Sequence, residues 1–420
     1  MTRKGVWGLQ QVRDKYLASL WEQSYTIWAM GQGNYGEMLN NQNNDGASRS
    51  SPVQLSGTLA SGWATVEAGD GTFYGTRDNG QLWIAGENDY GQLGMNERGT
   101  GDSGSTRRSS PTQIPGTTWD YVNSGMKSVV AVKTDGTMWS WGRMQSGSLG
   151  LNQSYSAGPG AGVQGFSSPV QIGTDTTWTN NFQAAANVVA IKTNGTLWVW
   201  GSNGDGRLGL SQPSGPGQRS SPAQLPGTDW SFCANGGSSN GAIKTNGTLW
   251  MWGNNEVGAL GQNNKTDYSS PRQVGTNTTW SDLAFSSSGS EAAVAAVKTD
   301  GTMWTWGGNE QGELGQNDKT DYSSTRQIGT GTDWKYVLGD GPEGGRNFWA
   351  TKTDGTVWNW GNGNYGSLDH NLASSDEGHQ FSSPTQMGAE TVYAGLNKRQ
   401  LSVTDRHTYV MKPLLTPSQL

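Results

Sequence analysis

The sequence predicts an all-β protein, a seven-bladed β-propeller of four-stranded blades that both termini close and that a short N-terminal helix or arm precedes. An apolar stretch containing Trp, followed by Gly and a Gly-rich turn, occurs seven times in the 420 residues. The first Trp of each copy follows the previous one by 52 to 59 residues, at Trp28, Trp83, Trp139, Trp198, Trp250, Trp304 and Trp358. A period of this size, carried by short strands, is typical of propeller blades.

Each repeat contains four strand-like segments, which we name strands a, b, c and d. Strand a begins with Trp, as at 119–122, and strand b is apolar, as at 129–132. Strand c carries the Trp anchor, and strand d reads Ser-Ser-Pro-x-Gln followed by an apolar residue, as at 269–274. Short apolar runs that end in Gly, Asp, Asn or Pro predict strands joined by turns.

The connection from strand b to strand c is an Asp-Gly or Asn-Gly pair, for example Asp135-Gly136 and Asn194-Gly195. These pairs predict hairpin turns with positive φ at both central residues. In strand c the two Trp residues alternate with a variable residue, so both rings lie on one face of the strand. We expect this face to pack on the neighbouring blade in every repeat.

The repeats resemble those of the regulator of chromosome condensation family. The motif Leu-Trp-x-Trp-Gly-x-Asn-x-x-Gly-x-Leu-Gly is almost complete at 249–261 and at 303–315, and the resemblance covers about residues 26 to 411. It implies a seven-bladed β-propeller. The namesake of the family is a nucleotide exchange factor that binds chromatin, but one fold hosts many functions, so the resemblance leaves the function open.

Both ends of the chain are expected to contribute to one blade. The N-terminal unit begins at strand c, 26–31, whereas the C-terminus supplies strands a and b and then 408–411. The last strand a is predicted at 391–394. One c-type strand is then left over, either 27–30 or 409–411. Closure by both ends removes exposed sheet edges, which would otherwise favour aggregation.

Tryptophan is expected to form most of the core. Of the 21 Trp residues, 12 lie in c strands and six open a strands, and Trp7, Trp21 and Trp349 fall outside these positions. Each ring buries roughly 150 to 250 Å² of surface. The 64 Gly and the low share of charged residues, 15%, agree with a turn-rich all-β chain.

Composition argues against several classes of partner. The net charge is −6, and the strongest local basic pair is Arg107-Arg108, whereas nucleic-acid binding needs clustered cations. No apolar run reaches the length of a membrane span and no signal peptide is recognisable, so we expect neither membrane insertion nor classical secretion. The single Cys233 excludes an intrachain disulfide.

The sequence does not predict an enzyme. His370, His379 and His407 have no spacing typical of a metal site or a catalytic triad, so we expect no metal and no catalytic residues. Gly31-x-Gly33-x-x-Gly36 matches a dinucleotide fingerprint in its letters, but no helix pattern follows and the glycines belong to the repeat. We therefore expect no cofactor.

The two faces of the predicted ring should differ. In an antiparallel blade the a–b and c–d loops emerge on one face, and the b–c turns and interblade links on the other. The c–d loops differ in length and sequence, and variable loops on a rigid scaffold are common binding sites. We nominate Tyr155, Phe166, Trp349 and Phe381 as partner contacts, on loop position alone; neutral drift of exposed loops is the alternative.

Residues 1–25 form a separate segment before the propeller, 26–420. Val12, Tyr16 and Leu20 recur at helical spacing near Trp7, which predicts a short amphipathic helix. This segment either packs on the rim of the propeller or docks onto another subunit. Residues 5–10 with 12–15 resemble the opening of several tail- and fibre-associated proteins of tailed bacteriophages.

Two functional hypotheses follow. The first is a noncatalytic virion structural or adaptor protein of a tailed phage, which binds other virion proteins or a host surface component through propeller loops and the N-terminal segment. The alternative is a cellular, cytoplasmic propeller that binds a protein partner, such as an inhibitor, a scaffold or a protein like an exchange factor. The oligomeric state stays open.

Overall fold

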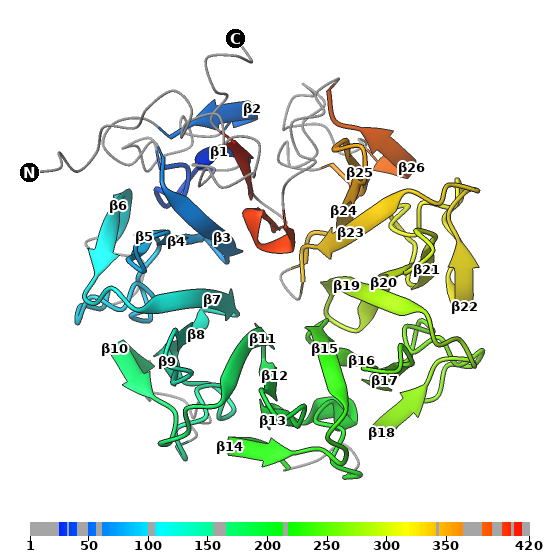
Figure 1. Ribbon diagram of the computed structural model, residues 1–420, viewed down its shortest axis with the longest axis horizontal. Coiled ribbons are helices and arrows are strands. Elements are labelled where there is room, and N and C mark those ends of the chain that lie inside the picture. The colour runs from blue at the N-terminus through cyan, green and yellow to red at the C-terminus, as the bar shows by residue number, and fades with distance from the viewer. Residues whose placement is uncertain are drawn as a thin grey trace, which may run out of the picture.

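The computed structural model describes residues 25–31, 33–39, 49–55, 61–99, 106–153, 165–212, 217–341, 344–363, 380–388, 397–404 and 407–413. In these residues seven antiparallel sheets of four strands surround one axis (Figure 1). The predicted all-β seven-bladed propeller is therefore confirmed.

The N-terminal strands are β1 (Tyr25–Gly31), β2 (Arg49–Gln54), β3 (Trp63–Gly69), β4 (Thr72–Arg77), β5 (Leu82–Gly86), β6 (Arg108–Ile114), β7 (Trp119–Gly125), β8 (Ser128–Lys133), β9 (Met138–Arg143) and β10 (Gly165–Gln171). The central strands are β11 (Trp178–Ala184), β12 (Asn187–Lys192), β13 (Leu197–Gly201), β14 (Arg219–Gln224), β15 (Trp230–Asn235), β16 (Ser239–Lys244), β17 (Leu249–Gly253) and β18 (Tyr268–Gln273). The C-terminal strands are β19 (Trp280–Ser288), β20 (Glu291–Lys298), β21 (Met303–Gly307), β22 (Tyr322–Gln327), β23 (Trp334–Gly339), β24 (Asn347–Lys352), β25 (Val357–Asn362), β26 (Gln380–Gln386), β27 (Leu401–Val403) and β28 (His407–Pro413). Two 3₁₀ helices are described, η3 (Gly204–Gly206) and η5 (Lys398–Gln400).

We number the blades from the closing sheet. Blade 1 is β27-β28-β1-β2, and blades 2 to 7 are β3–β6, β7–β10, β11–β14, β15–β18, β19–β22 and β23–β26. Within blades 2 to 7, strand a lies nearest the axis and strand d lies on the outside (Figure 1). Figure 1 also shows η5, in red, at the centre of the ring.

The closing blade differs from the prediction. β1 pairs with β28 over seven residues, from Tyr25 opposite Pro413 to Gly31 opposite His407. β27 pairs with the other edge of β28. Residues 27–30 are therefore strand c and 409–411 belong to strand b, so no strand is left over. The predicted strand a at 391–394 lies outside the described residues, and β27 takes the place of strand a.

The b–c turns also differ from the predicted type. Gly136 has a φ of 76°, but Asp135 is not among the non-glycine residues with positive φ. The Gly136 N–H donates to Lys133 O and the Lys133 N–H donates to Thr137 O, which gives a three-residue loop with glycine in the left-handed region. The Asp135 carboxylate accepts bonds from the Thr137 N–H at 3.0 Å and its Oγ1 at 2.7 Å. Asp therefore suits this turn position because its carboxylate accepts hydrogen bonds from Thr137.

In blades 3 to 7 the second Trp of strand c contacts the preceding blade, as predicted, whereas the first Trp bonds within its own hairpin. In blade 4 the rings of Trp198 and Trp200 both lie edge-on against Trp178 of strand a, with centroids 6.1 and 5.9 Å away. Trp200 is fully buried, and its Nε1 donates to Ser148 O of blade 3 at 2.9 Å. The second Trp of strand c makes the same type of bond in each of blades 3 to 7.

The Gly-rich turn after strand c fits against the next blade. A Cβ on Gly258 would lie 2.5 Å from Cα of Ser323 in the strand d of blade 6, and a Cβ on Gly261 would lie 3.1 Å from Trp306 Nε1. Asn263 N–H donates to Ser323 O at 2.7 Å. The recurring Gly of this turn and the Ser-Ser pair of the next blade's strand d therefore form one interblade joint.

Candidate functional site

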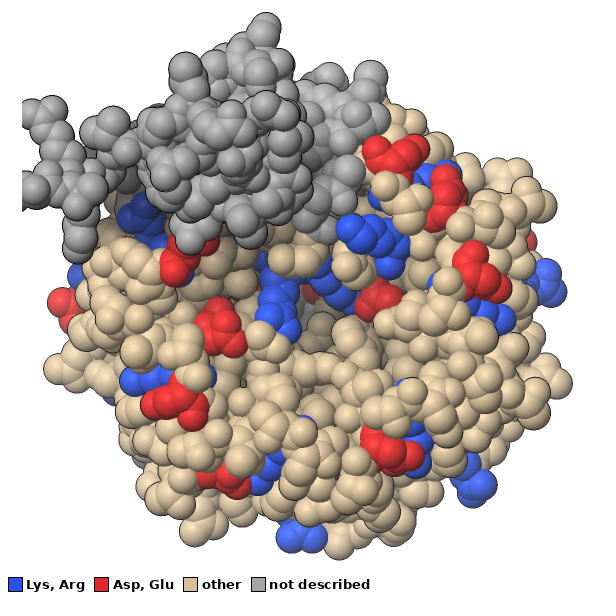
Figure 2. All heavy atoms as spheres, viewed as in Figure 1, with Lys and Arg blue, Asp and Glu red and all other residues tan. Residues whose placement is uncertain are grey.

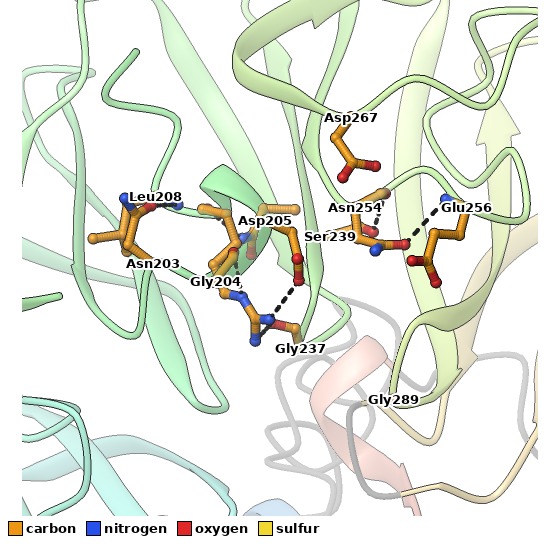
Figure 3. Close-up of polar contacts among 12 residues, drawn as sticks. Asn203, Gly204, Asp205, Leu208, Gly237, Ser239, Asn254, Glu256, Asp267 and Gly289 are labelled. Atoms are coloured by element: carbon orange, nitrogen blue, oxygen red, sulfur yellow. Dashed lines mark hydrogen bonds and ion pairs between the residues drawn. The ribbon is translucent and has the colours of Figure 1, made fainter. Parts of the chain in front are cut away.

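The a–b turns and the c–d loops share one face of the ring, which we call the loop face. Arg207, in the c–d loop of blade 4, donates from Nη1 to Gly237 O in the a–b turn of blade 5 at 2.9 Å (Figure 3). Its Nε donates to Gly204 O at 2.8 Å, and Nη2 pairs with Asp205 at 2.9 Å. This side chain joins two neighbouring blades at their loops.

Ion pairs also join neighbouring blades on the loop face, for example at Lys127 and at Arg346. Lys127, in the a–b turn of blade 3, lies 3.0 Å from the Glu87 carboxylate in the c–d loop of blade 2. Arg346, before β24 in blade 7, pairs with Glu310 at 2.6 Å and lies 4.0 Å from Glu313, both in blade 6. Burial raises the pKa of Glu87 and of Glu313 to about 7. The loop face therefore contains buried carboxyl groups whose pKa lies near neutrality.

A cavity of about 220 Å³ lies on the axis of the ring. The strand a of blades 2 to 7, β27 and η5 all contribute to its lining. In the view of Figure 2, Lys and Arg side chains gather beside the hollow at the centre of the ring. The inner strands and η5 thus build a second candidate site, which we call the channel site.

A capping box holds η5 in place. The side chain of Asn397 accepts a bond from the Arg399 N–H at 2.9 Å, and the Gln400 side chain accepts one from the Asn397 N–H at 2.9 Å. Gln400 is buried. These two hydrogen bonds satisfy backbone donors at the start of the short helix. They thereby fix the backbone of Lys398 and Arg399, which lie between Asn397 and Gln400.

The two cations of η5 have different surroundings. Lys398 Nζ donates to Asp282 Oδ1 at 2.7 Å and to Leu283 O at 2.9 Å. Arg399 donates from Nη2 to Asn180 O at 3.0 Å, and its guanidinium lies 4.7 Å from the centroid of the Tyr121 ring. Lys398 is neutralised by a carboxylate, whereas Arg399 contacts a carbonyl and a ring.

Side chains on the inner strands bond to the backbone of the neighbouring blade. Ser402 Oγ accepts a bond from the Ala68 N–H at 2.9 Å, and Asn123 Oδ1 accepts one from the Ala184 N–H at 2.7 Å. Gln183 Oε1 accepts a bond from the Asn235 N–H at 2.8 Å. These polar side chains line blades 1 to 4, while Ala284, Phe285 and Leu338 line the opposite arc.

Glu67 of β3 lies where blades 1, 2 and 3 meet. Asn123 Nδ2 of blade 3 donates to its Oε1, and Ser402 Oγ of blade 1 donates to its Oε2 at 3.4 Å. Burial raises the pKa of Glu67 to about 8, although these hydrogen bonds act in the opposite direction. The carboxyl group is therefore mainly protonated at neutral pH.

The structure places three of the eight nominated contact residues. Phe166 in β10 and Phe381 in β26 are half-buried and pack on the hydrophobic core. Trp349 is wrong as a surface contact, because it lies within β24 opposite Leu338 and is fully buried. The other five lie outside the described residues: Trp7, Val12, Tyr16, Leu20 and Tyr155.

Sequence reasoning missed the channel site. Its cations, Lys398 and Arg399, lie outside the repeat motif, and the only local signal is the capping-box pattern from Asn397 to Gln400. Among the described residues no group of three or more His, Cys, Asp or Glu side chains is arranged to hold a metal ion. His370 and His379 lie outside these residues, and His407 is buried in β28. No helix in the described part of the chain is long and apolar enough to span a membrane.

Comparison with known proteins supports the repeat family. The family model for the regulator of chromosome condensation (RCC1) repeat matches residues 246–290. The chain is 25% identical to the ultraviolet-B receptor UVR8 of Arabidopsis thaliana, over 81% of this chain and 74% of UVR8. It is 26% identical to the E3 ubiquitin-protein ligase HERC2 of Mus musculus over 59% of this chain, which spans 5% of that ligase.

Solved structures support the fold. Prp20p from Saccharomyces cerevisiae, reported with its binding properties to Gsp1p and histones, has a TM-score of 0.72 at 14% identity, covering 95% of this chain and 93% of Prp20p. Human WBSCR16 also has a TM-score of 0.72 at 14% identity. The match covers 94% of this chain and 100% of the WBSCR16 chain. The chain is thus similar to RCC1-repeat proteins in sequence and to the solved structures in its propeller fold. None of these similar proteins is a virion component.

Proposed function

We propose that this protein is a noncatalytic, cellular propeller that binds a protein partner through its loop face. The difference between the two faces supports this proposal. On the b–c side, blades 3 to 7 repeat one arrangement, in which the Lys that ends strand b lies over a strand a Trp and a strand c Trp. The loop face repeats the Gly and Ser-Ser joint, but the charged side chains that bridge its blades, such as Lys127, Arg207 and Arg346, differ from blade to blade. Prp20p, reported to bind Gsp1p and histones, offers a precedent for partner binding on this fold.

The observation that carries the proposal is the turn at Met126. Gly125 pairs with Ser128, and the two residues between them, Met126 and Lys127, have φ of 51° and 68°. Such a turn favours Asn and Gly, because a side chain in the left-handed region costs roughly 1 to 2 kcal/mol. Met126 nevertheless exposes 44% of its surface, one of two large hydrophobic residues exposed in the described residues. A strained, exposed methionine fits a contact residue, since its flexible thioether adapts to varied surfaces.

Site-specific photocrosslinking tests this proposal. A photoreactive phenylalanine analogue replaces Met126 in one variant and Val53 in another, where Val53 lies on the outer strand β2 and exposes 40% of its surface. In native extract we expect discrete protein adducts from position 126 and few from position 53. Equal adducts at both positions, or none at 126, would contradict a partner site around this turn.

Met126→Asn separates stability from binding. Asn tolerates the left-handed conformation, so the variant should raise the free energy of unfolding by about 1 kcal/mol. It removes the apolar side chain, so capture of the partner identified by crosslinking should weaken. Urea denaturation and a binding titration measure the two effects. A variant that binds normally would show that Met126 is not a contact.

The N-terminal segment is proposed as a second docking element. Tyr16→Asp combined with Leu20→Asp, in the full chain, would disrupt the apolar face predicted for the helix. We expect loss of incorporation into native complexes with an unchanged unfolding midpoint. A lower midpoint with normal incorporation would instead indicate packing on the propeller. The virion role depends only on the short resemblance of residues 5–15, and the similar proteins favour the cellular alternative.

A further inference from the structure

The volume of the channel site sets the size of a guest. Apolar cavities of about 150 Å³ in proteins bind benzene. The channel cavity of about 220 Å³ therefore has room for a six-membered ring with a substituent of a few atoms.

The lining of the cavity combines polar side chains from blade 4 with apolar side chains from blades 6 and 7, where Asp340 also lies. Asn180, Asn181 and Gln183 contribute from blade 4, and Ala284, Phe285 and Leu338 contribute from blades 6 and 7. Such a lining suits a guest with a flat apolar body and one polar end, since ligand pockets combine apolar walls with a few placed polar groups.

Arg399 supplies the group that recognises the polar end. Among the described residues, its hydrogen bond is the one from Nη2 to Asn180 O, so several of its five N–H donors remain for a guest. The ring of Tyr121 and the capping box hold its plane and its backbone. A guanidinium fixed in this way matches the two oxygens of a carboxylate.

The charge of the lining argues for a single negative charge on the guest. Lys398 is already paired with Asp282 at 2.7 Å, so it adds little free positive charge. An acidic side chain, Asp340, also lines the cavity. A dianion such as phosphate would meet this negative potential without a second free cation.

We propose that the channel site binds a small organic monocarboxylate with an aromatic or similarly flat apolar body, whose carboxylate pairs with Arg399. The guest lies on the axis, between η5 and the loop face. Its binding does not depend on the proposed protein partner.

Titration calorimetry of the full chain with benzoate tests this proposal, with benzamide and inorganic phosphate as comparison probes. Arg399→Met removes the guanidinium and keeps an unbranched side chain, and Ala284→Leu fills the apolar part of the cavity. Arg326→Met is the matched control, because Arg326 lies 3.7 Å from the Tyr322 ring on the outer strand β22. Unfolding midpoints of all variants identify any that fail to fold.

We expect saturable binding of one benzoate per chain, and binding of benzamide and phosphate at least about tenfold weaker. Arg399→Met and Ala284→Leu should each weaken benzoate binding about tenfold or more, whereas Arg326→Met should not change it. The proposal is overturned if benzoate does not bind below about 10 mM. It is also overturned if phosphate or benzamide binds as well as benzoate, or if folded Ala284→Leu protein binds normally.

Discussion

At the scale of single residues, the two Trp of strand c in blades 3 to 7 have different roles. Trp304 is half-buried and donates to Thr302 Oγ1 of its own hairpin at 3.0 Å. Trp306 is fully buried and donates to Ala259 O of the preceding blade at 2.8 Å. The first residue thus fixes a turn, and the second connects two blades.

Trp306→Phe and Trp304→Phe measure this difference. The first change leaves a buried carbonyl without its donor and a small void, so it should lower the free energy of unfolding by about 2 to 3 kcal/mol. The second change loses a bond at the surface and part of a cation–π contact with Lys298, which should cost about 1 kcal/mol or less. Urea denaturation of both variants gives the comparison. Equal losses would show that the interblade bond adds nothing measurable.

The sequence predicts the Trp positions well, because period and alternation are visible in the letters. It predicts the turn chemistry less well. Asp135-Gly136 indicates a tight hairpin, but the letters do not distinguish a two-residue loop from a three-residue one, in which Asp serves as an acceptor for Thr137. Trp349 was predicted to lie in a loop for a related reason. The sequence before it is irregular, but Trp349 itself lies within strand b of blade 7.

At the scale of elements, the turn after strand c acts as the joint between blades. Gly258 has a φ of 84°, and an added Cβ would lie 2.5 Å from a backbone atom of Ser323. Gly275 has a φ of 57°, and nothing lies within 4 Å of an added Cβ. Both glycines have a left-handed backbone, but only at Gly258 does the neighbouring blade lie close to the added Cβ.

Gly275→Ala should therefore cost about 1 kcal/mol of stability, from the left-handed backbone alone. Gly258→Ala adds a backbone clash that no rotamer relieves, so it should cost about 3 kcal/mol or more. Thermal or urea unfolding of the two purified variants checks this. Similar midpoints would mean that the blades move apart at little energetic cost.

The closing blade shows where element prediction fails. β27 has three residues and no Trp, so the pattern that marks strand a elsewhere is missing. The run 409–411 looks like another strand, but only its pairing with both β27 and β1 identifies it as strand b. The register of this blade depends on contacts between segments from the two ends of the chain. The local sequence of either segment does not show these contacts.

At the scale of the whole molecule, the channel site could not be predicted, because its lining combines short segments from every blade with η5. Each segment alone reads as an ordinary strand. Only closure of the ring brings Glu67, Asn123 and Ser402 together. The same closure joins the two termini through β1 and β28.

Glu67 gives this closure a pH dependence. Its pKa is raised by burial from 4.5 to about 8 in the folded protein. Below the lower value the group is protonated in both states, and its contribution to stability is fully present. As pH rises towards 8, the unfolded chain loses this proton while the folded chain keeps it, so stability falls. Above the higher value, both states are ionised and the loss is complete.

Glu67→Gln imitates the protonated carboxyl at every pH. At pH 5 the variant and the native chain should have similar stability, and at pH 8 the variant should be more stable by on the order of 1 kcal/mol, since Glu67 also borders the cavity and part of the burial effect is screened. Urea denaturation at both pH values measures this difference. Glu256→Gln, at an exposed loop residue, is the control and should leave the pH dependence unchanged. If Glu67→Gln loses stability between pH 5 and pH 8 as steeply as the native chain, Glu67 is not the group that titrates at the junction of blades 1, 2 and 3.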